Sequence, residues 1–245
     1  MTGVLLAGLS AVVVAAFTVE ATLGFGATVI AVALASSVLR LPLGEMLPSF
    51  VPVNLALSTL LAARSFRDAD WRLLCLKILP AMLVGLPAGM WAFSSLPEAM
   101  LRRGLGAFLL VLSAPLLFLK AREPKPLAPA LSWGLLGLAG VLHGAFATGG
   151  PMVVFVLSRS PVSKATFRAT LSLLWALLAV VLLARWTWSG TLTMSTFTLS
   201  AQLLPAMLIG LVVGNVIHGK VDERRFRLFV NVMLFVFGLL LLVRS

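Results

Sequence analysis

The sequence predicts an all-α integral membrane protein made of two related halves that lie in the bilayer in opposite orientations. Three observations lead to this prediction: the apolar composition, an internal repeat and an uneven distribution of basic residues. The chain has 245 residues, of which 60% are hydrophobic and 11% are charged, and its mean hydropathy is +1.09. Soluble domains have about 45–50% apolar and about 25% charged residues. A water-soluble domain could not bury so much apolar surface, so the net charge of +11 is not interpreted as nucleic-acid binding.

Ten apolar segments are delimited by charged residues, prolines and glycines. In order they cover residues 3–18, 27–39, 46–63, 73–92 and 104–119, then 128–143, 150–158, 169–185, 198–217 and 228–243. The stretch 120–127 begins Lys-Ala-Arg-Glu-Pro-Lys-Pro and predicts a cytoplasmic linker. It separates a first membrane repeat, residues 1–119, from a second, residues 128–245. Each repeat is predicted to hold a broken or re-entrant helix hairpin followed by three transmembrane helices.

An internal duplication is visible in the fourth segment of each half. The sequence LPAMLVGL at 79–86, followed by Gly89, matches LPAMLIGL at 204–211, followed by Gly214, at an offset of 125 residues. The same offset pairs two Glu and two Arg residues: Glu98 with Glu223 and Arg102 with Arg227. A chance match between Leu-rich and Ala-rich helices is the alternative, but Pro, Met and two glycines in register favour a true repeat.

The basic residues indicate how each half faces the membrane. Residues 3–39 are too long for one membrane helix, because 37 residues would extend about 55 Å. If 3–39 and 128–158 are both hairpins, fourteen of the 19 Lys and Arg lie on one side, whereas single crossings divide them ten to nine. Cytoplasmic loops carry the Lys and Arg excess, so hairpins are favoured, with both termini outside the cytoplasm. Each half then crosses an odd number of times, which predicts the inverted repeats of many secondary transporters.

Each predicted hairpin turns through a tip that contains glycine, at 20–27 (EATLGFGA) and at 143–151 (HGAFATGGP). Each tip opens into an apolar helix, whose free N–H groups and partial positive charge can bind an anion. We therefore predict a site for a small oxyanion where two helix ends, one from each half, meet near the membrane midplane. The predicted substrate contacts are Thr22, Gly24, Phe25, Gly26 and Ala27 in the first tip, and Thr148, Gly149, Gly150 and Pro151 in the second. The alternative is that these glycines only let helices pack closely.

Three ionisable residues near the tips are further candidates. Glu20 and His143 occupy nearly equivalent places in the two halves, and charges at membrane depth commonly mark proton pathways. A proton-coupling pair is the functional hypothesis, and the alternative is that each residue caps a broken helix or bonds the backbone of the turn. Arg168, at the start of an apolar helix, could bind an oxyanion through two hydrogen bonds or could be a membrane anchor.

The repeat, with Gly-Phe-Gly in the first tip and Thr-Gly-Gly-Pro in the second, resembles the sulfite exporter TauE/SafE family over essentially the whole chain. The resemblance implies a membrane carrier for sulfite, sulfonates or related small anions. This chain departs from the family pattern at Ala27 and at Ala147-Thr148, where further glycines are often expected.

The predicted function is a secondary transporter for a small anion, of the sulfite or sulfonate type, acting by alternating access in the inner membrane. Its expected partners are the lipid bilayer, the anion and protons as coupling ion, and a homo-oligomer is left open. Cys75 is the single cysteine, and the two histidines are 75 residues apart, so no metal, cofactor or enzymatic activity is predicted. The alternatives are a passive anion channel, a membrane scaffold that does not transport, and an intramembrane enzyme.

Overall fold

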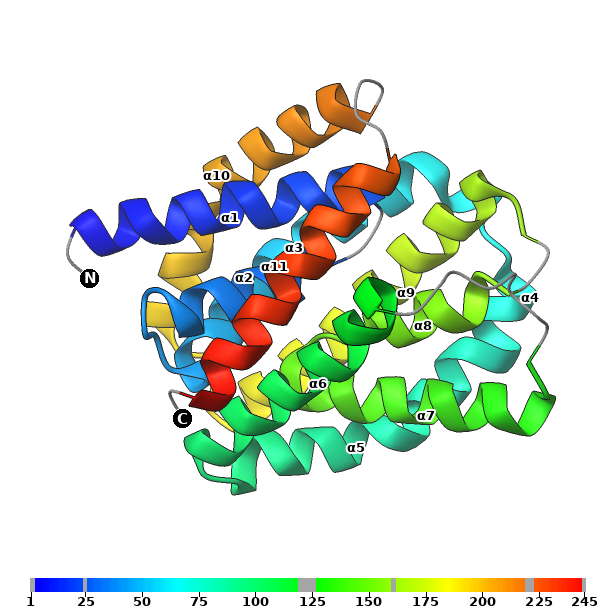
Figure 1. Cartoon of the computed structure of the whole chain (residues 1–245), viewed down its shortest axis with the longest axis horizontal. Helices are drawn as coiled ribbons and strands as arrows, with labels where there is room; N and C mark the ends of the chain where they lie inside the picture. The colour runs from blue at the N-terminus through cyan, green and yellow to red at the C-terminus, as the bar shows by residue number, and fades with distance from the viewer. Residues whose placement is uncertain (1–2, 24–25, 119–126, 160–161, 219–222, 244–245) are drawn as a thin grey trace. The chain divides into compact units, whose positions relative to one another are not determined.

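The fold is known from a computed structural model, which describes residues 3–23, 26–118, 127–159, 162–218 and 223–243 (Figure 1). All of its described elements are helices, and each of the ten apolar segments of the sequence is found as a helix. The prediction of an all-helical chain is therefore confirmed. The predicted linker falls almost entirely outside the described residues, as do Gly24 and Phe25 of the first tip.

The helices of the first half follow the predicted order. They are α1 (Gly3–Leu23), α2 (Ala27–Ser37), α3 (Leu43–Ser65), α4 (Trp71–Leu73), α5 (Leu79–Ser95) and α6 (Glu98–Phe118). A 3₁₀ turn at Phe66–Asp68 follows α3, and a π turn at Leu74–Ile78 joins α4 to α5. Pro80 accounts for the π turn, since it has no N–H and its ring displaces the carbonyl four residues earlier. The N–H of Leu79 accordingly bonds to the oxygen of Leu74.

The second half has the same succession of long and short helices. They are α7 (Pro129–Phe146), α8 (Gly150–Leu157), α9 (Lys164–Trp188), α10 (Met194–His218) and α11 (Glu223–Val243). The second helix of each half is short: α2 has 11 residues and α8 has 8. These lengths correspond to about 16 Å and about 12 Å, well below the hydrocarbon thickness of about 30 Å. Neither helix is long enough to cross a membrane by itself.

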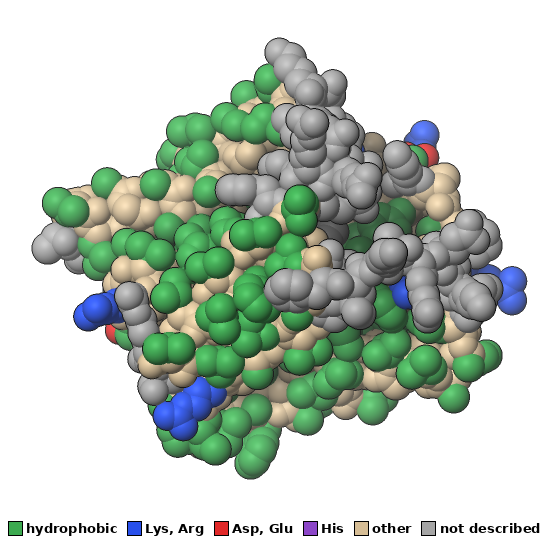
Figure 2. Space-filling view, viewed as in Figure 1, with side chains coloured by type: hydrophobic (Ala, Val, Ile, Leu, Met, Phe, Trp, Pro, Cys, Tyr) green, Lys and Arg blue, Asp and Glu red, His purple; other side chains and the backbone are tan. Residues whose placement is uncertain are grey.

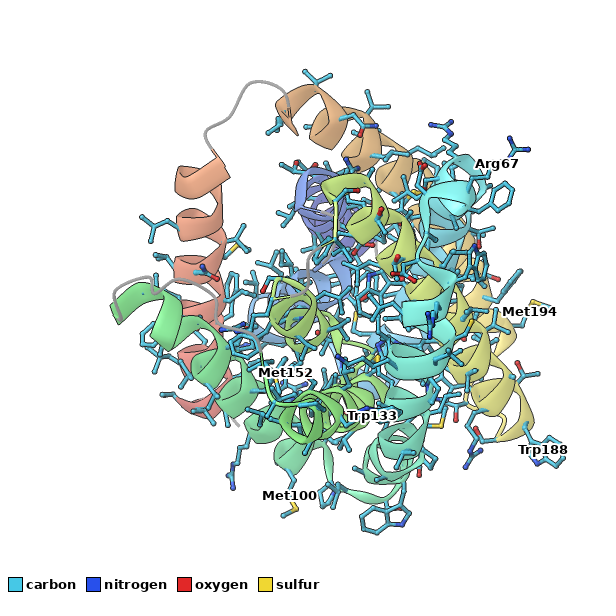
Figure 3. All side chains as sticks on the ribbon, turned by 90° about the vertical axis from the view of Figure 1, so that its right-hand side faces the viewer. Arg67, Met100, Trp133, Met152, Trp188 and Met194 are labelled. Carbon is cyan, nitrogen blue, oxygen red and sulfur yellow. The ribbon has the colours of Figure 1, made fainter. Side chains whose placement is uncertain are left out.

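Six helical stretches within the described residues are long and apolar enough to span a bilayer. They are Gly3–Thr22, Leu43–Asp68, Trp71–Ser95, Pro129–Phe146, Ala165–Trp188 and Met194–Ile217. Apolar side chains cover most of the described surface in the view of Figure 2, as expected for a protein that faces lipid. Trp188 and Met194, at neighbouring ends of α9 and α10, are 91% and 79% exposed and point away from the helices in Figure 3. The protein is therefore an integral membrane protein with several spans.

The described helices form two compact units, and each unit combines helices of both halves. Unit 1 consists of 1–47, 96–123 and 203–245, and unit 2 consists of 48–95 and 124–202. Neither unit coincides with residues 1–119 or 128–245, so the two halves exchange helices.

In unit 2, α5 of the first half packs against α7 of the second half, and the two helices lie side by side in Figure 1. Gly85 and Gly89 of α5 contact the α7 backbone so closely that no side chain fits between. A Cβ on Gly85 would lie 2.9 Å from the carbonyl carbon of Gly137 and 2.9 Å from the nitrogen of Val141. Small residues that let two backbones approach are a common basis of helix association in membranes.

In unit 1 the corresponding pair is α10 with α1. A Cβ on Gly210 would lie 2.7 Å from the oxygen of Val14, and one on Gly214 would lie 2.6 Å from the oxygen of Thr18. The Thr18 hydroxyl also donates a hydrogen bond to the Gly210 oxygen, at 3.3 Å. Gly210 and Gly214 are the repeat equivalents of Gly85 and Gly89. The fourth segment of each half thus packs, through the same two glycines, on the first segment of the other half.

Candidate anion site at the helix tips

The first tip is shaped by a glycine whose backbone conformation disfavours any other residue. Helix α1 ends at Leu23 and α2 begins at Ala27, with Gly26 as its N-cap at φ +106°. The nearest atom to a Cβ on Gly26 would be Ile30 Cδ1, at 4.0 Å, so space is not limiting there. The left-handed backbone is the reason for glycine at this position.

Glu20 supplies the acceptor for the first N–H of α2. It lies in the last turns of α1 with 4% of its surface exposed, and its Oε2 accepts a hydrogen bond from the Ala27 nitrogen at 2.8 Å. A carboxylate in this place complements the partial positive charge at the start of a helix. Glu20 therefore caps α2, which is the structural alternative considered for it, while its predicted role in proton coupling stays a prediction.

The second tip needs glycine for space. Helix α7 ends at Phe146, Ala147 takes a left-handed conformation at φ +51°, and Gly149 is the N-cap of α8 at φ −74°. A Cβ on Gly149 would lie 2.9 Å from Met82 Cε and 3.2 Å from the Ala139 carbonyl carbon, so a larger residue would push against α7 itself. Pro151 lies in the first turn of α8, where its missing N–H costs no intrahelical bond.

His143 holds this second tip from the last turn of α7. Its Nδ1 accepts a hydrogen bond from the Gly149 nitrogen at 3.4 Å, and its ring stacks on Trp175 of α9 with centroids 5.8 Å apart. A neutral imidazole whose Nδ1 accepts carries its proton on Nε2, which is then a donor. His143 is 6% exposed, and Nε2 has no hydrogen-bond partner among the described residues.

Thr148 presents a second polar group without a partner at the same tip. The residue directly precedes the N-cap of α8 and is 3% exposed, and its Oγ1 makes no hydrogen bond within the described part of the chain. Buried polar atoms are nearly always satisfied, so an unpaired hydroxyl beside a helix N-terminus is a candidate for contact with a water molecule or a ligand. The N–H groups of Gly150 and Met152 lie in the same first turn, where no intrahelical acceptor exists.

The two tips are equivalent in the repeat. Glu20 and His143 are 123 residues apart, as are Ala27 and Gly150, the first residues of α2 and α8. In both tips, the residue near the end of the long helix gives a hydrogen-bond acceptor to a backbone N–H at the start of the short helix. The sequence equivalence is therefore matched by the same kind of bond, although its donor is Ala27, the first residue of α2, in one tip and Gly149, the N-cap of α8, in the other.

Two other predicted contacts have different surroundings. The Thr22 hydroxyl donates to the Thr18 oxygen at 2.8 Å and to the Gly214 oxygen at 3.3 Å, so it contributes to the packing of α1 on α10. Arg168 lies on α9, seven residues before Trp175, which is an axial distance of about 10 Å. Trp175, which the sequence analysis did not single out, is the residue of α9 that contacts the second tip. A Trp in the middle of an apolar helix, away from the interfaces where Trp usually lies, was the signal available.

The comparison with known proteins identifies the family. Residues 9–241 match the sulfite exporter TauE/SafE family. The chain belongs to this family. Members of the TauE/SafE family are transporters, so the chain is a membrane transporter and not an enzyme. No solved structure matches it.

Two relatives found by sequence comparison both have names that describe transport proteins. The chain is 28% identical to the "Probable sulfite/organosulfonate exporter TauE" of Cupriavidus necator over 219 residues, which cover 86% of this chain and 83% of the relative. It is 29% identical to the "Probable inner membrane transporter protein TsaS" of Comamonas testosteroni over 176 residues, covering 71% of this chain and 73% of the relative.

For a TauE/SafE transporter, the second tip offers a set of hydrogen-bond donors. They are the Thr148 hydroxyl, the His143 Nε2–H and the N–H groups of the first turn of α8. No group of three His, Cys, Asp or Glu side chains that could hold a metal ion occurs among the described residues. A cluster of donors at a helix N-terminus suits an anion, and it needs no fully charged residue to bind one.

Proposed function

We propose that the protein is a secondary carrier that moves a small sulfur oxyanion or organosulfonate across the inner membrane by alternating access. The proposed substrate class rests on the family match and on the relative from Cupriavidus necator, whose name includes sulfite and organosulfonate. The α8 tip, with its unpaired Thr148 hydroxyl, supports an anionic cargo independently.

The inverted-repeat architecture is part of this proposal. Residues 1–119 and 128–245 are the two repeats, with both termini outside the cytoplasm. The support is the reciprocal packing: Gly85 and Gly89 meet α7 as Gly210 and Gly214 meet α1, which is the pattern expected of two copies related by a pseudo-two-fold axis.

Export assays in a strain that lacks the gene test the substrate class. We expect expression of the protein to restore growth on, and efflux of, sulfite, thiosulfate or a short organosulfonate. If none of these anions is exported, the sulfur-anion assignment is wrong. Saturable exchange of another anion would still support the proposal that the protein is a carrier. Conductive flux without saturation or counter-flow would instead indicate a passive anion channel.

A matched pair of variants tests the site. Thr148→Val removes an unpaired hydroxyl with almost no change in shape, and so does Ser36→Ala near the end of α2, where the Ser36 hydroxyl is also buried and unpaired. Neither change breaks an existing hydrogen bond, so both variants should fold. Because a hydrogen bond to a charged group is worth about 1.5–3 kcal/mol, Thr148→Val should lower export about tenfold or more. Ser36→Ala should export as the native protein does, and equal export by both variants would exclude Thr148 from the site.

Proton coupling through Glu20 and His143 is also proposed. Protonation of His143 on Nδ1 would remove the acceptor of the Gly149 N–H, and protonation of Glu20 would remove the negative charge at the start of α2. Either event would loosen a tip. The test is the pH dependence of export in Glu20→Gln and His143→Ala, and if both variants retain the native pH profile, these residues do not couple protons.

A further inference from the structure

The two tips are equivalent in fold but opposite in electrostatic character. At the first tip, an acidic side chain, Glu20, is bonded to the first N–H of α2 at 2.8 Å. At the second, the acceptor is the ring nitrogen of His143, which is neutral and lies farther from its donor, at 3.4 Å. The repeat therefore places a carboxylate at one helix N-terminus and an uncharged group at the other.

A tethered carboxylate is chemically the same kind of ligand as a small oxyanion. It accepts hydrogen bonds from helix N–H groups and complements the partial positive charge at the helix end. Glu20 thus already satisfies the start of α2 from within the chain. Another anion there would lie a few ångströms from a like charge, and the repulsion at such a distance is substantial even in a partly screened site.

The second tip has the opposite set of features. The first turn of α8 holds no acidic residue, and no carboxylate is found bonded to it among the described residues. Two side chains more than nine-tenths buried, Thr148 and His143, hold polar atoms there that have no hydrogen-bond partner in the described part of the chain. Because Nδ1 of His143 accepts the Gly149 N–H, its Nε2 is a donor, so this atom and the α8 N–H groups all require acceptors. An anion supplies acceptors and negative charge together.

We infer that the cargo anion binds at one tip, the N-terminus of α8 with Thr148 and His143, while Glu20 acts as a built-in anion that occupies the equivalent place on α2. This inference deepens the proposed function and rests on it for the statement that the cargo is an anion. In place of two equivalent anion-binding tips, one tip, at α8, binds the anion, and Glu20 occupies the other.

The decisive variant converts the second tip into a copy of the first. His143→Glu places a carboxylate at the position equivalent to Glu20, and His143→Gln is the matched control because it also loses the stacking on Trp175 but adds no charge. Binding is measured on purified full-length protein in detergent, as the shift of the unfolding temperature with sulfite, methanesulfonate and nitrate at constant ionic strength. The native protein should be stabilised by an anion, and His143→Gln should bind it up to about tenfold more weakly, because the Gln amide keeps an acceptor for the Gly149 N–H and a donor for the anion but loses the ring packed on Trp175. His143→Glu should bind at least about 100-fold more weakly, since the added carboxylate repels the anion.

Glu20→Gln keeps the inference falsifiable if His143→Glu does not fold. It retains an acceptor for the Ala27 N–H and removes only the charge, so anion binding at α8 should persist. Loss of binding in folded Glu20→Gln, or native binding in His143→Glu, would overturn the inference. The inference would also be overturned if no anion stabilised the native protein. It would be supported if nitrate, but not the sulfur anions, stabilised the native protein and this stabilisation were lost in His143→Glu. The proposed function is decided separately by export in cells, and the absence of sulfur-anion export would contradict that function without affecting the asymmetry of the tips.

Discussion

Substitution of Gly140 by Ala should separate α7 from α5 and destabilise the protein. A Cβ on Gly140 would contact the Met82 oxygen and lie 2.8 Å from the Met82 carbonyl carbon and 2.9 Å from its Cα. All three atoms belong to the α5 backbone, so no side chain can rotate to make room. Overpacking of a close-packed interior costs about 1–3 kcal/mol, and a contact with rigid backbone belongs at the upper end of that range.

Gly134 provides the control on the same helix. It is exposed, and nothing lies within 4 Å of a Cβ placed on it. Both substitutions gain the same helix propensity of about 1 kcal/mol, so the difference between Gly140→Ala and Gly134→Ala isolates the cost of the contact. With about 3 kcal/mol for that cost and about 2–4 °C per kcal/mol for a chain of this length, Gly140→Ala should unfold about 6–12 °C below Gly134→Ala.

The assay is thermal unfolding of the detergent-solubilised protein, followed by intrinsic tryptophan fluorescence and by loss of the monodisperse peak on size exclusion. Equal unfolding temperatures for the two variants would refute the reasoning. That result would mean that α5 and α7 are not in backbone contact at Gly140, and it would weaken the argument for reciprocal packing at the equivalent glycines.

Three further predictions concern the first tip, the α2–α3 connection and the topology. Gly26→Ala should lower the free energy of unfolding by about 1–2 kcal/mol, because the left-handed backbone at residue 26 disfavours a Cβ although the space around it is open. A lower unfolding temperature of the variant would show this loss. Glu98 accepts hydrogen bonds from the Leu43 nitrogen at 2.8 Å and from Arg102 at 3.0 Å, and so caps α3 from another helix. Glu98→Ala should therefore lower stability by about 1 kcal/mol and Glu98→Gln by less, and a Gln variant as unstable as the Ala variant would contradict the capping role. In a Cys75→Ser background, single cysteines placed at either chain end should react with an impermeant reagent added outside the cell, and labelling only after permeabilisation would contradict the proposed orientation.

The sequence by itself determined the membrane class, the helices and the positions of the two tips. Long apolar runs interrupted by charge, Pro or Gly leave few alternatives in a bilayer, where every backbone polar group must be bonded within its own segment. The short second helix of the second half could be predicted because the apolar run after Gly149 is brief. The sequence predicts an apolar segment at 150–158, and α8 begins at Gly150 and ends at Leu157.

Only the tertiary structure decided which helices pair and what the tip residues bond to. A membrane helix is apolar on nearly all sides, so its sequence does not encode which face meets a neighbour, and the packing of Gly85 on α7 could not be foreseen from the repeat alone. The contact of Trp175 with His143 joins two helices and depends in the same way on packing. The sequence placed Glu20 and His143 at equivalent positions, but the opposite characters of the two tips emerged only from their bonds to Ala27 and Gly149. Such bonds depend on the angle at which the chain turns back, which is set by the helices packed around each tip.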